Sequence, residues 1–349
     1  MNSKRFDLRY LLPVIILFLS CKKEEITVVP AFYFWQSGFD LNEQEKETLE
    51  VLGVKKLYIK FFDVGWDDAS EQPVPLATIS FEDKIPEATE IIPVVFITNE
   101  TFEKLGVEND TAVKLLAFKI ARKIEYLVET NDLSAPKEIQ LDCDWNITTR
   151  HSYFLLIEAL KNFPGFKEMK WSATIRLHQI KYFDKTGVPP VDRGALMFYN
   201  MGDIEDVGAK NSIFEEIVAQ QYIEDINNYP LPLDVAIACF SWGLLFDDSK
   251  LLKIFYPLYA EDIADSLFKH ADGNNYIAKK NFYFEGQFIV EGNTVKLETQ
   301  TPENSLTAAQ LLKEHLKSDD RTVILYHLDS NIIKHYTNEN FEAIYSTFK

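Results

Sequence analysis

Cysteine is scarce in this sequence, with three residues among 349, at positions 21, 143 and 239. No CxxC pair is present, and the six histidines are dispersed without the spacing of metal ligands. The sequence therefore predicts no metal site and no cofactor. Cys143 and Cys239 each lie in a strand-like apolar run, and the strand order argued below separates them. We expect two buried free thiols; a disulfide formed in an oxidising compartment is the alternative.

Positive charge is also in deficit, because 36 Lys and Arg residues face 54 Asp and Glu residues, for a net charge of −18. Binding of nucleic acid or of anionic membrane surfaces needs concentrated positive charge, so this balance argues against both. Neutral partners such as glycans, or cationic ones, fit better. The sequence also lacks a P-loop, a GxGxxG loop and a nucleophile elbow, which leaves NTPase, Rossmann and hydrolase-fold esterase functions without support. Nothing in the sequence determines an oligomeric state.

A long apolar segment is missing as well. The apolar run at residues 11–19 has roughly ten residues, whereas a transmembrane helix needs about 20. It follows Lys4, Arg5 and Arg9 and is followed by the small residue Ser20, directly before Cys21. This order is typical of a signal peptide, so we expect residues 1–20 to be removed.

The Leu-Phe-Leu-Ser-Cys segment at 17–21 resembles the lipobox of bacterial lipoproteins, although Phe18 departs from the commoner Leu or Val. Loose lipoboxes of this kind are familiar in Bacteroidota. The resemblance implies that Cys21 carries acyl chains, with membrane lipid as its partner, and that residues 21–30 form an acylated tether. It also implies a lipid-anchored protein of the cell envelope, at the outer membrane, on its periplasmic or surface face. Each buried CH₂ of an acyl chain contributes about 0.8 kcal/mol. An ordinary secreted protein is the alternative.

From residue 26 onward, short β-branched and aromatic runs alternate with helical patterns, as expected of βα units around a parallel sheet. Eight runs have the composition of strands: 31–36, 55–62, 91–98, 139–145, 170–177, 194–201, 234–242 and 322–329. We therefore predict an α/β fold, a single (β/α)₈ domain of TIM-barrel type over residues 31–349.

Helical patterns fall between most of these strands, at 42–52, 111–129, 152–162, 212–227, 306–317 and 339–348. Residues 65–86 are acidic and contain proline, so we expect a long loop over the strand ends. Residues 281–301 alternate in hydrophobicity and carry Gly-Gln and Glu-Gly-Asn turn signals, which predict an antiparallel β-hairpin. We place it in an insertion at about 244–301, between the seventh and eighth units.

The fourth strand carries the clearest candidate chemistry. Its alternation puts Gln140, Asp142 and Asp144 on one face, pointing into the barrel near the strand's C-terminal end. In barrels of this type, functional groups gather at that end. Two carboxylates so placed repel each other and can split their pKa values into an acid and a base, as glycoside hydrolysis requires.

This Asp-x-Asp is similar to part of the chitinase-type signature D-x-x-D-x-D-x-E, but Asn146 stands where that signature needs its catalytic glutamate. The resemblance therefore lacks the proton donor. Asp142 and Asp144 are candidates for direct catalysis, for ligand or cation binding, or for a structural role in which they pair with cations such as Lys60 or Arg176.

Other strand ends supply aromatic and polar residues that suit a sugar, since aromatic rings stack on apolar sugar faces and polar groups take the hydroxyls. Filling of the barrel by these aromatic residues is the alternative role. Our candidates for substrate binding are Trp35, Gln36, Gln140, Arg176, Tyr199, Asn200 and Trp242.

The Trp35-Gln36 pair, the run from Gln140 to Asp144 and the segment from Met197 to Gly202 look like motifs of an uncharacterised bacterial family of periplasmic proteins and lipoproteins. The resemblance implies a barrel like those of glycoside hydrolases and carries no established activity. Our leading hypothesis is an envelope-anchored lipoprotein that binds or hydrolyses glycans, with Asp142 and Asp144 as the catalytic pair. The alternative is a non-catalytic carbohydrate-binding or structural surface lipoprotein.

The anchor is testable by substitution of Cys21. Because acylation needs its thiol, Cys21→Ala should abolish metabolic labelling with radioactive palmitate and release the protein from the membrane fraction. Cys143→Ala, which keeps the lipobox, is the control and should stay labelled. Unchanged membrane retention of Cys21→Ala would count against lipidation.

Overall fold

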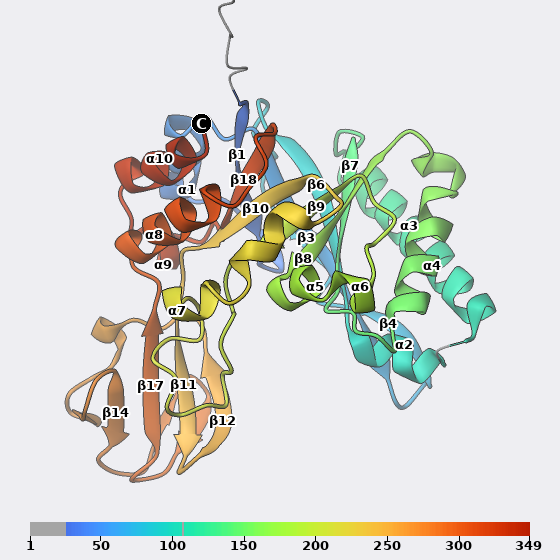
Figure 1. The fold of residues 1–349 in the computed structure, drawn as a ribbon. Coiled ribbons are helices and arrows are strands. Elements are labelled where there is room, and N and C mark those ends of the chain that lie inside the picture. The colour runs from blue at the N-terminus through green and yellow to red at the C-terminus, as the bar shows by residue number, and fades with distance from the viewer. Residues whose placement is uncertain (1–25, 107) are drawn as a thin grey trace, which may run out of the picture.

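Eight parallel strands close into a barrel in the computed structural model, which describes residues 26–106 and 108–349 (Figure 1). The predicted leader and Cys21 lie outside the described residues. The order around the barrel is β1-β18-β10-β9-β8-β7-β6-β3, and β1 also pairs with β3, which completes the ring. These strands are β1 (Val28–Phe34), β3 (Lys56–Asp67), β6 (Glu90–Ile97), β7 (Glu138–Asp142), β8 (Lys170–Arg176), β9 (Arg193–Met197), β10 (Leu233–Ala238) and β18 (Arg321–Tyr326). The predicted (β/α)₈ barrel is confirmed.

Hydrogen bonds across the barrel show which side chains point inward. Tyr33 Oη on β1 donates to Gln140 Oε1 on β7 over 2.7 Å, although these strands are not neighbours in the sheet. Gln140 Nε2 donates in turn to Ser172 Oγ at 3.3 Å. All three side chains are buried. Gln140 therefore faces the barrel interior, as predicted, and Cys143 belongs to the opposite face of the chain.

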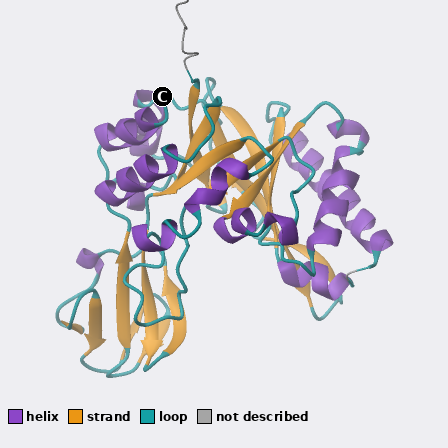
Figure 2. Ribbon diagram, viewed as in Figure 1, coloured by secondary structure: helices purple, strands orange, loops and turns teal. Residues whose placement is uncertain are grey.

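Helices cover the outside of the barrel (Figure 2). The longest is α3, whose buried residues, such as Val113, Leu116 and Ile120, follow the helical period toward the strands. No described helix is long and apolar enough to cross a membrane. The helices are α1 (Glu43–Val51), α2 (Asn99–Leu105), α3 (Asp110–Thr130), α4 (Arg150–Lys161), α5 (Leu177–Lys181), α6 (Phe183–Thr186), α7 (Glu216–Ala219), α8 (Pro302–Lys313), α9 (Ser330–Ile333) and α10 (Asn338–Thr347).

The insertion between β10 and α8 is a small β-structure rather than the single hairpin expected from the sequence (Figure 2). Its five-stranded sheet has the order β12-β11-β17-β14-β13. A hairpin of β15 and β16 does occur and turns at Glu285 and Gly286, but β17, which we expected in that hairpin, pairs with β11 and β14. The strands are β11 (Ser241–Asp247), β12 (Lys250–Phe255), β13 (Phe268–His270), β14 (Asn275–Ala278), β15 (Phe282–Phe284), β16 (Gln287–Ile289) and β17 (Thr294–Thr299).

The inserted sheet has an apolar core of its own. Leu245, Phe255, Phe268 and Val295 are buried there, and Phe284 of the hairpin packs edge-on against Phe255 with ring centroids 5.1 Å apart. The residues of this core come from strands that are separated by irregular turns. No local pattern in the sequence therefore predicts it.

Two further expectations were wrong in detail. Residues 65–86 are not only a loop, since β3 continues to Asp67 and pairs with the antiparallel strand β4 (Gln72–Leu76). β4 lies at the end of the sheet order, and an edge strand tolerates its two prolines. The region also holds the short pair β2 (Gly38–Phe39) and β5 (Ser80–Phe81). The helix expected at 212–227 is only α7 and a 3₁₀ turn, Ile223–Asn228, and the residues before α7 are tied to the inserted strand β17, where the backbone N–H of Ser212 donates to Glu298.

Paired charges close the N-terminal end of the barrel. Glu138 lies 2.9 Å from Lys56 Nζ and accepts a 2.7 Å hydrogen bond from Ser172 Oγ. Arg193 holds Asp234 through two bonds, of 2.9 and 3.1 Å. Removing one partner of a buried pair leaves an uncompensated charge. The N-terminal end of the barrel therefore contributes to stability rather than to ligand binding.

Cys143 and Cys239 are both buried free thiols, as predicted. Burial raises the pKa of each thiol, which removes the reactive thiolate. We expect neither residue to react with a maleimide under native conditions and both to react in denaturant without prior reduction, as measured by mass spectrometry. Native labelling of either residue, or a need for reductant, would contradict this.

Candidate functional site

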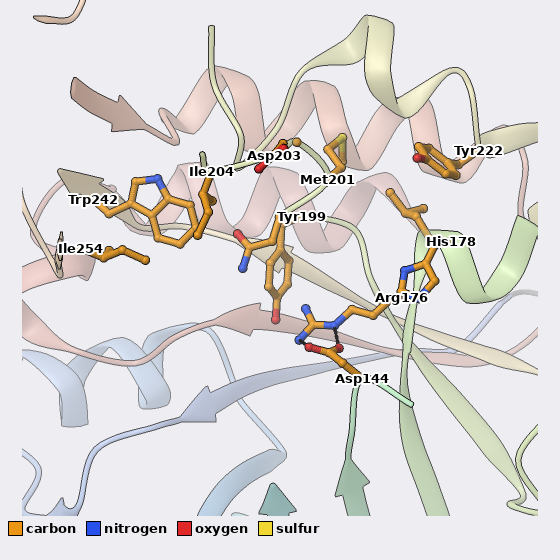
Figure 3. A pocket seen from close by; sticks show the side chains of 13 residues that line it. Asp144, Arg176, His178, Tyr199, Met201, Asp203, Ile204, Tyr222, Trp242 and Ile254 are labelled. Carbon is orange, nitrogen blue, oxygen red and sulfur yellow. Dashed lines mark hydrogen bonds and ion pairs between the residues drawn. The ribbon is translucent and has the colours of Figure 1, made fainter. Parts of the chain in front are cut away.

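A cleft opens where the C-terminal ends of the strands meet the inserted sheet. It consists of two cavities, of about 510 and 420 Å³, which share Asn200, Trp242 and Ile254. We call their union the cleft. The first cavity is lined by Asp144, Arg176, Leu177, His178, Tyr199, Asn200, Met201, Gly202, Asp203, Ile204, Tyr222, Trp242 and Ile254 (Figure 3). The second is lined by Trp35, Gln36, Asn200, Phe240, Trp242, Ile254, Tyr256, Pro257, Tyr326, His327 and Asp329.

An ion pair between Asp144 and Arg176 forms the polar floor of the first cavity (Figure 3). Arg176 Nε donates to Asp144 Oδ1, and Nη2 donates to Oδ2 at 3.3 Å, which is the two-pronged geometry that suits a guanidinium and a carboxylate. Burial by itself lowers the pKa of Arg176, but Asp144 and Asp142 outweigh it and raise that pKa. The pair therefore presents fixed, mutually neutralised charges to a ligand.

Asp142 lies beneath this pair and lines neither cavity. Its side chain is buried and accepts a 2.5 Å hydrogen bond from Thr174 Oγ1. Burial raises the pKa of Asp142 to about 6, and the nearby Asp144 adds to the rise, while Arg176 and the Thr174 hydroxyl oppose it. Gln140 is deeper still, in the network with Tyr33 and Ser172. Of the three inward residues predicted on β7, only Asp144 reaches the cleft.

Asn146, at the position of the missing glutamate, faces away from the cleft. Its Oδ1 accepts hydrogen bonds from the backbone N–H groups of Thr148 and Thr149, at 2.8 and 3.1 Å, and from Thr148 Oγ1 at 2.6 Å. These bonds shape the turn that leads into α4, and Asn146 lines neither cavity. Short polar side chains favour such turns because they bond their own local backbone.

Aromatic side chains form much of the rest of the wall. Tyr199 packs against Tyr326 with ring centroids 5.4 Å apart, and Tyr326 also contacts Trp35 at 5.7 Å. Trp242 comes from β11 and meets Phe240 edge-on at 5.3 Å. The cleft thus contains the predicted residues Trp35, Gln36, Asp144, Arg176, Tyr199, Asn200 and Trp242.

Several residues of the cleft were not among those predicted from the sequence. Ile254 lies on β12 of the inserted sheet and Tyr256 directly follows that strand, so their place opposite the barrel depends on a sheet that we did not predict from the sequence. Tyr222 lies in the segment 212–227, which we expected to be a helix, and Ile204 lies in the loop before it. Tyr326 is the last residue of the eighth strand, β18, and this position at a strand end could have predicted its place in the cleft.

Comparisons with known proteins agree with the fold. No family model matches this sequence, and no curated protein is significantly similar to it. The spore cortex-lytic enzyme SleL of Bacillus cereus has a similar structure, with a TM-score of 0.53 and 12% identity over 93% of this chain and 75% of that one. A chitinase from Chromobacterium violaceum gives 0.50 and 11%, over 93% and 99%. At such identities the likeness shows the barrel fold alone, and the resemblance to an uncharacterised bacterial family stays a prediction.

The buried carboxyl of Asp142 predicts a specific pH dependence. Because its pKa is raised in the folded state, the wild type gains stability from it at low pH and loses that stability as the pH rises through 6. Relative to the wild type, Asp142→Asn should gain on the order of 3 kcal/mol between about pH 4 and pH 7, for roughly two pKa units at 1.36 kcal/mol each. Urea unfolding across this range measures it. Asp203→Asn, at an exposed carboxylate of the same cleft, controls for the loss of one negative charge. A difference in stability between Asp142→Asn and the wild type that does not change with pH would contradict the assignment.

Proposed function

We propose that this protein binds glycans in the cleft and does not hydrolyse them, as a carbohydrate-binding barrel of the cell envelope. The observation that carries the proposal is the combination in one cleft of aromatic walls with a neutralised Asp144–Arg176 floor, while Asn146 is engaged in a turn outside it. The structural neighbours, a chitinase and a cortex-lytic enzyme, support a glycan as the class of ligand.

The lining suits a sugar chain. Ligand sites are mostly apolar concavities with a few placed polar groups, and Tyr199, Tyr222 and Trp242 supply ring faces beside Arg176 and Asn200. Because the two cavities share Trp242, a ligand longer than one sugar can run from Tyr222 to Trp35.

Hydrolysis needs a protonated acid beside the scissile bond and a second carboxyl group across it. Both carboxylate oxygens of Asp144 accept hydrogen bonds from Arg176, and Asp142 lines neither cavity. Asp203 lies on the exposed rim, where its Oδ1 accepts from the Glu205 backbone N–H at 2.9 Å. None of Asp142, Asp144 and Asp203 is therefore placed as a general acid above the Asp144–Arg176 pair.

Glycoside hydrolysis is the second candidate. One observation favours it, namely the pKa of about 6 at Asp142, which is in the range of a general acid. For this activity Asp142 would have to reach the cleft past Arg176 and Asp144.

Membrane anchoring through Cys21 belongs to the same proposal. β1 begins at Val28, at the end of the barrel opposite the inserted sheet (Figure 1). A tether on that side would leave the cleft open toward the extracellular or periplasmic space.

The proposal predicts binding without turnover. Calorimetric titration with chito-oligosaccharides should give saturable binding, and mass spectrometry should recover them intact after prolonged incubation. Tyr222→Ala, which removes a ring from the cleft, should weaken the affinity about tenfold, since stacking of this kind contributes about 1 kcal/mol beyond burial. Tyr182→Ala is the matched control, because Tyr182 flanks the same Lys181 but lines neither cavity. Shortened products would favour the hydrolase, and the absence of binding would refute the proposal.

A further inference from the structure

Glu298 is a buried carboxylate on the inserted strand β17, outside the set of residues that line the cleft. Its side chain is fully buried, with 0% exposure. Burying a charge is costly unless it is paired and hydrogen-bonded, so the partners of Glu298 indicate what the residue does.

Three hydrogen-bond donors and one lysine ammonium group converge on this carboxylate. Oε2 accepts from the Ser212 backbone N–H at 3.0 Å, from the Ser212 hydroxyl, and from Trp242 Nε1 at 2.8 Å. Oε1 lies 2.9 Å from Lys296 Nζ. An ionised carboxylate accepts the three hydrogen bonds on Oε2 and pairs with Lys296 through Oε1. A glutamine amide would keep one neutral oxygen and would turn its NH₂ group toward a donor or toward the Lys296 ammonium group.

The first partner, Trp242, is the aromatic residue shared by both cavities. Its ring, drawn in Figure 3, has an apolar body for a ligand and one polar atom, Nε1. This nitrogen donates to Glu298. A charge-assisted hydrogen bond of this kind is stronger than a neutral one and has a preferred direction. Glu298 therefore fixes the rotation of the Trp242 ring in the cleft.

The second partner, Ser212, ends the loop 202–212, whose first residues line the first cavity. Gly202 N–H donates to the Ser212 carbonyl at 3.0 Å, and Asn200 N–H donates to the Ile213 carbonyl at 2.8 Å. The approach is so close that a Cβ on residue 202 would lie 2.8 Å from Ser212 Cα, which requires glycine there. Holding Ser212 thus holds the cleft edge at Asn200 and Gly202.

The same strand secures the loop at two more points. Lys296 Nζ donates to the Asp206 carbonyl at 3.2 Å, and Asn211 Nδ2 donates to the Thr299 carbonyl at 3.0 Å. We propose that Glu298 is a positioning residue for the ligand: it couples the inserted sheet to the barrel rim by orienting Trp242 and the loop 202–212 together. This inference rests on the proposed function for its effect on affinity, but not for its effect on Trp242.

Glu298→Gln is the first test, and Glu138→Gln is its matched control, because Glu138 is also buried and 2.9 Å from a lysine, but at the other end of the barrel. In ¹H–¹⁵N spectra of the full chain, Trp242→Phe identifies the Trp242 indole signal among those of the five tryptophans. Glu298→Gln should shift this signal upfield, because at most a neutral amide oxygen then replaces the charged acceptor, and Glu138→Gln should leave it in place.

Affinity is the second readout. Glu298→Gln should weaken binding of the chito-oligosaccharide about tenfold, the equivalent of about 1.4 kcal/mol, with no change in Glu138→Gln. The double variant Glu298→Gln/Trp242→Phe should lose less affinity than the product of the two single fold-losses, because both substitutions remove the same interaction. If Glu298→Gln does not fold, Ser212→Ala removes one donor and should weaken binding in the same direction.

The outcomes separate the two proposals. An unshifted Trp242 signal, or unchanged affinity, in folded Glu298→Gln overturns the positioning role. Absence of glycan binding by the wild type refutes the proposed function and, with it, the effect of Glu298 on affinity, whereas the indole signal still reports whether Glu298 orients Trp242.

Discussion

Closure of the parallel barrel is the constraint on which the rest of the structure depends. β1 pairs with β18 on one side and with β3 on the other, so every strand of the ring has both of its edges satisfied. Since all eight strands run the same way, their C-terminal ends form one rim. The interior is packed with side chains, so a ligand can meet the protein only at that rim. Burial of Gln140 and Asp142 and exposure of Asp144 follow from this geometry.

The inserted sheet turns the rim into a cleft. Only Cys239 and Phe240 separate the barrel strand β10 from β11, so the chain passes from the ring into the insertion almost without a linker. Trp242 therefore stands at the junction, and Ile254 and Tyr256 form the wall that faces the barrel. The acidic side chains of the cleft are paired with a cation, as Asp144 is, or shape local turns, as Asp203 and Asp329 do, and aromatic rings such as Tyr222 and Trp242 line the rest together with aliphatic and polar side chains.

Much of the fold could be predicted from the sequence because barrel strands are buried on both faces and read as short apolar runs. All eight strands and five of the six helical patterns were identified within a few residues of their positions. The failures arose where distant contacts override local patterns. Ser212 bonds to Glu298, 86 positions away, so the start of the expected helix belongs instead to a loop held by the inserted sheet. β17 pairs with β11 rather than with its nearest neighbour in sequence.

The candidate site divides in the same way. Positions at or shortly after the C-terminal ends of strands, such as Trp35, Asp144, Arg176 and Asn200, could be predicted because these ends meet at the rim. Alternation along β7 predicted that Asp142 points inward, but not how deeply it lies, because depth depends on the tilt of neighbouring strands and on the cover provided by Arg176. The role of Asn146 required the turn bonds to Thr148 and Thr149.

The most direct test of the central claim, binding without cleavage in the cleft, is a crystal structure of the protein after prolonged incubation with a chito-oligosaccharide. If the protein binds glycans without hydrolysing them, an intact sugar chain will lie between the Asp144–Arg176 pair and the ring of Trp242. A cleaved chain with Asp142 turned toward the broken bond, or a sugar bound away from the cleft, would contradict it.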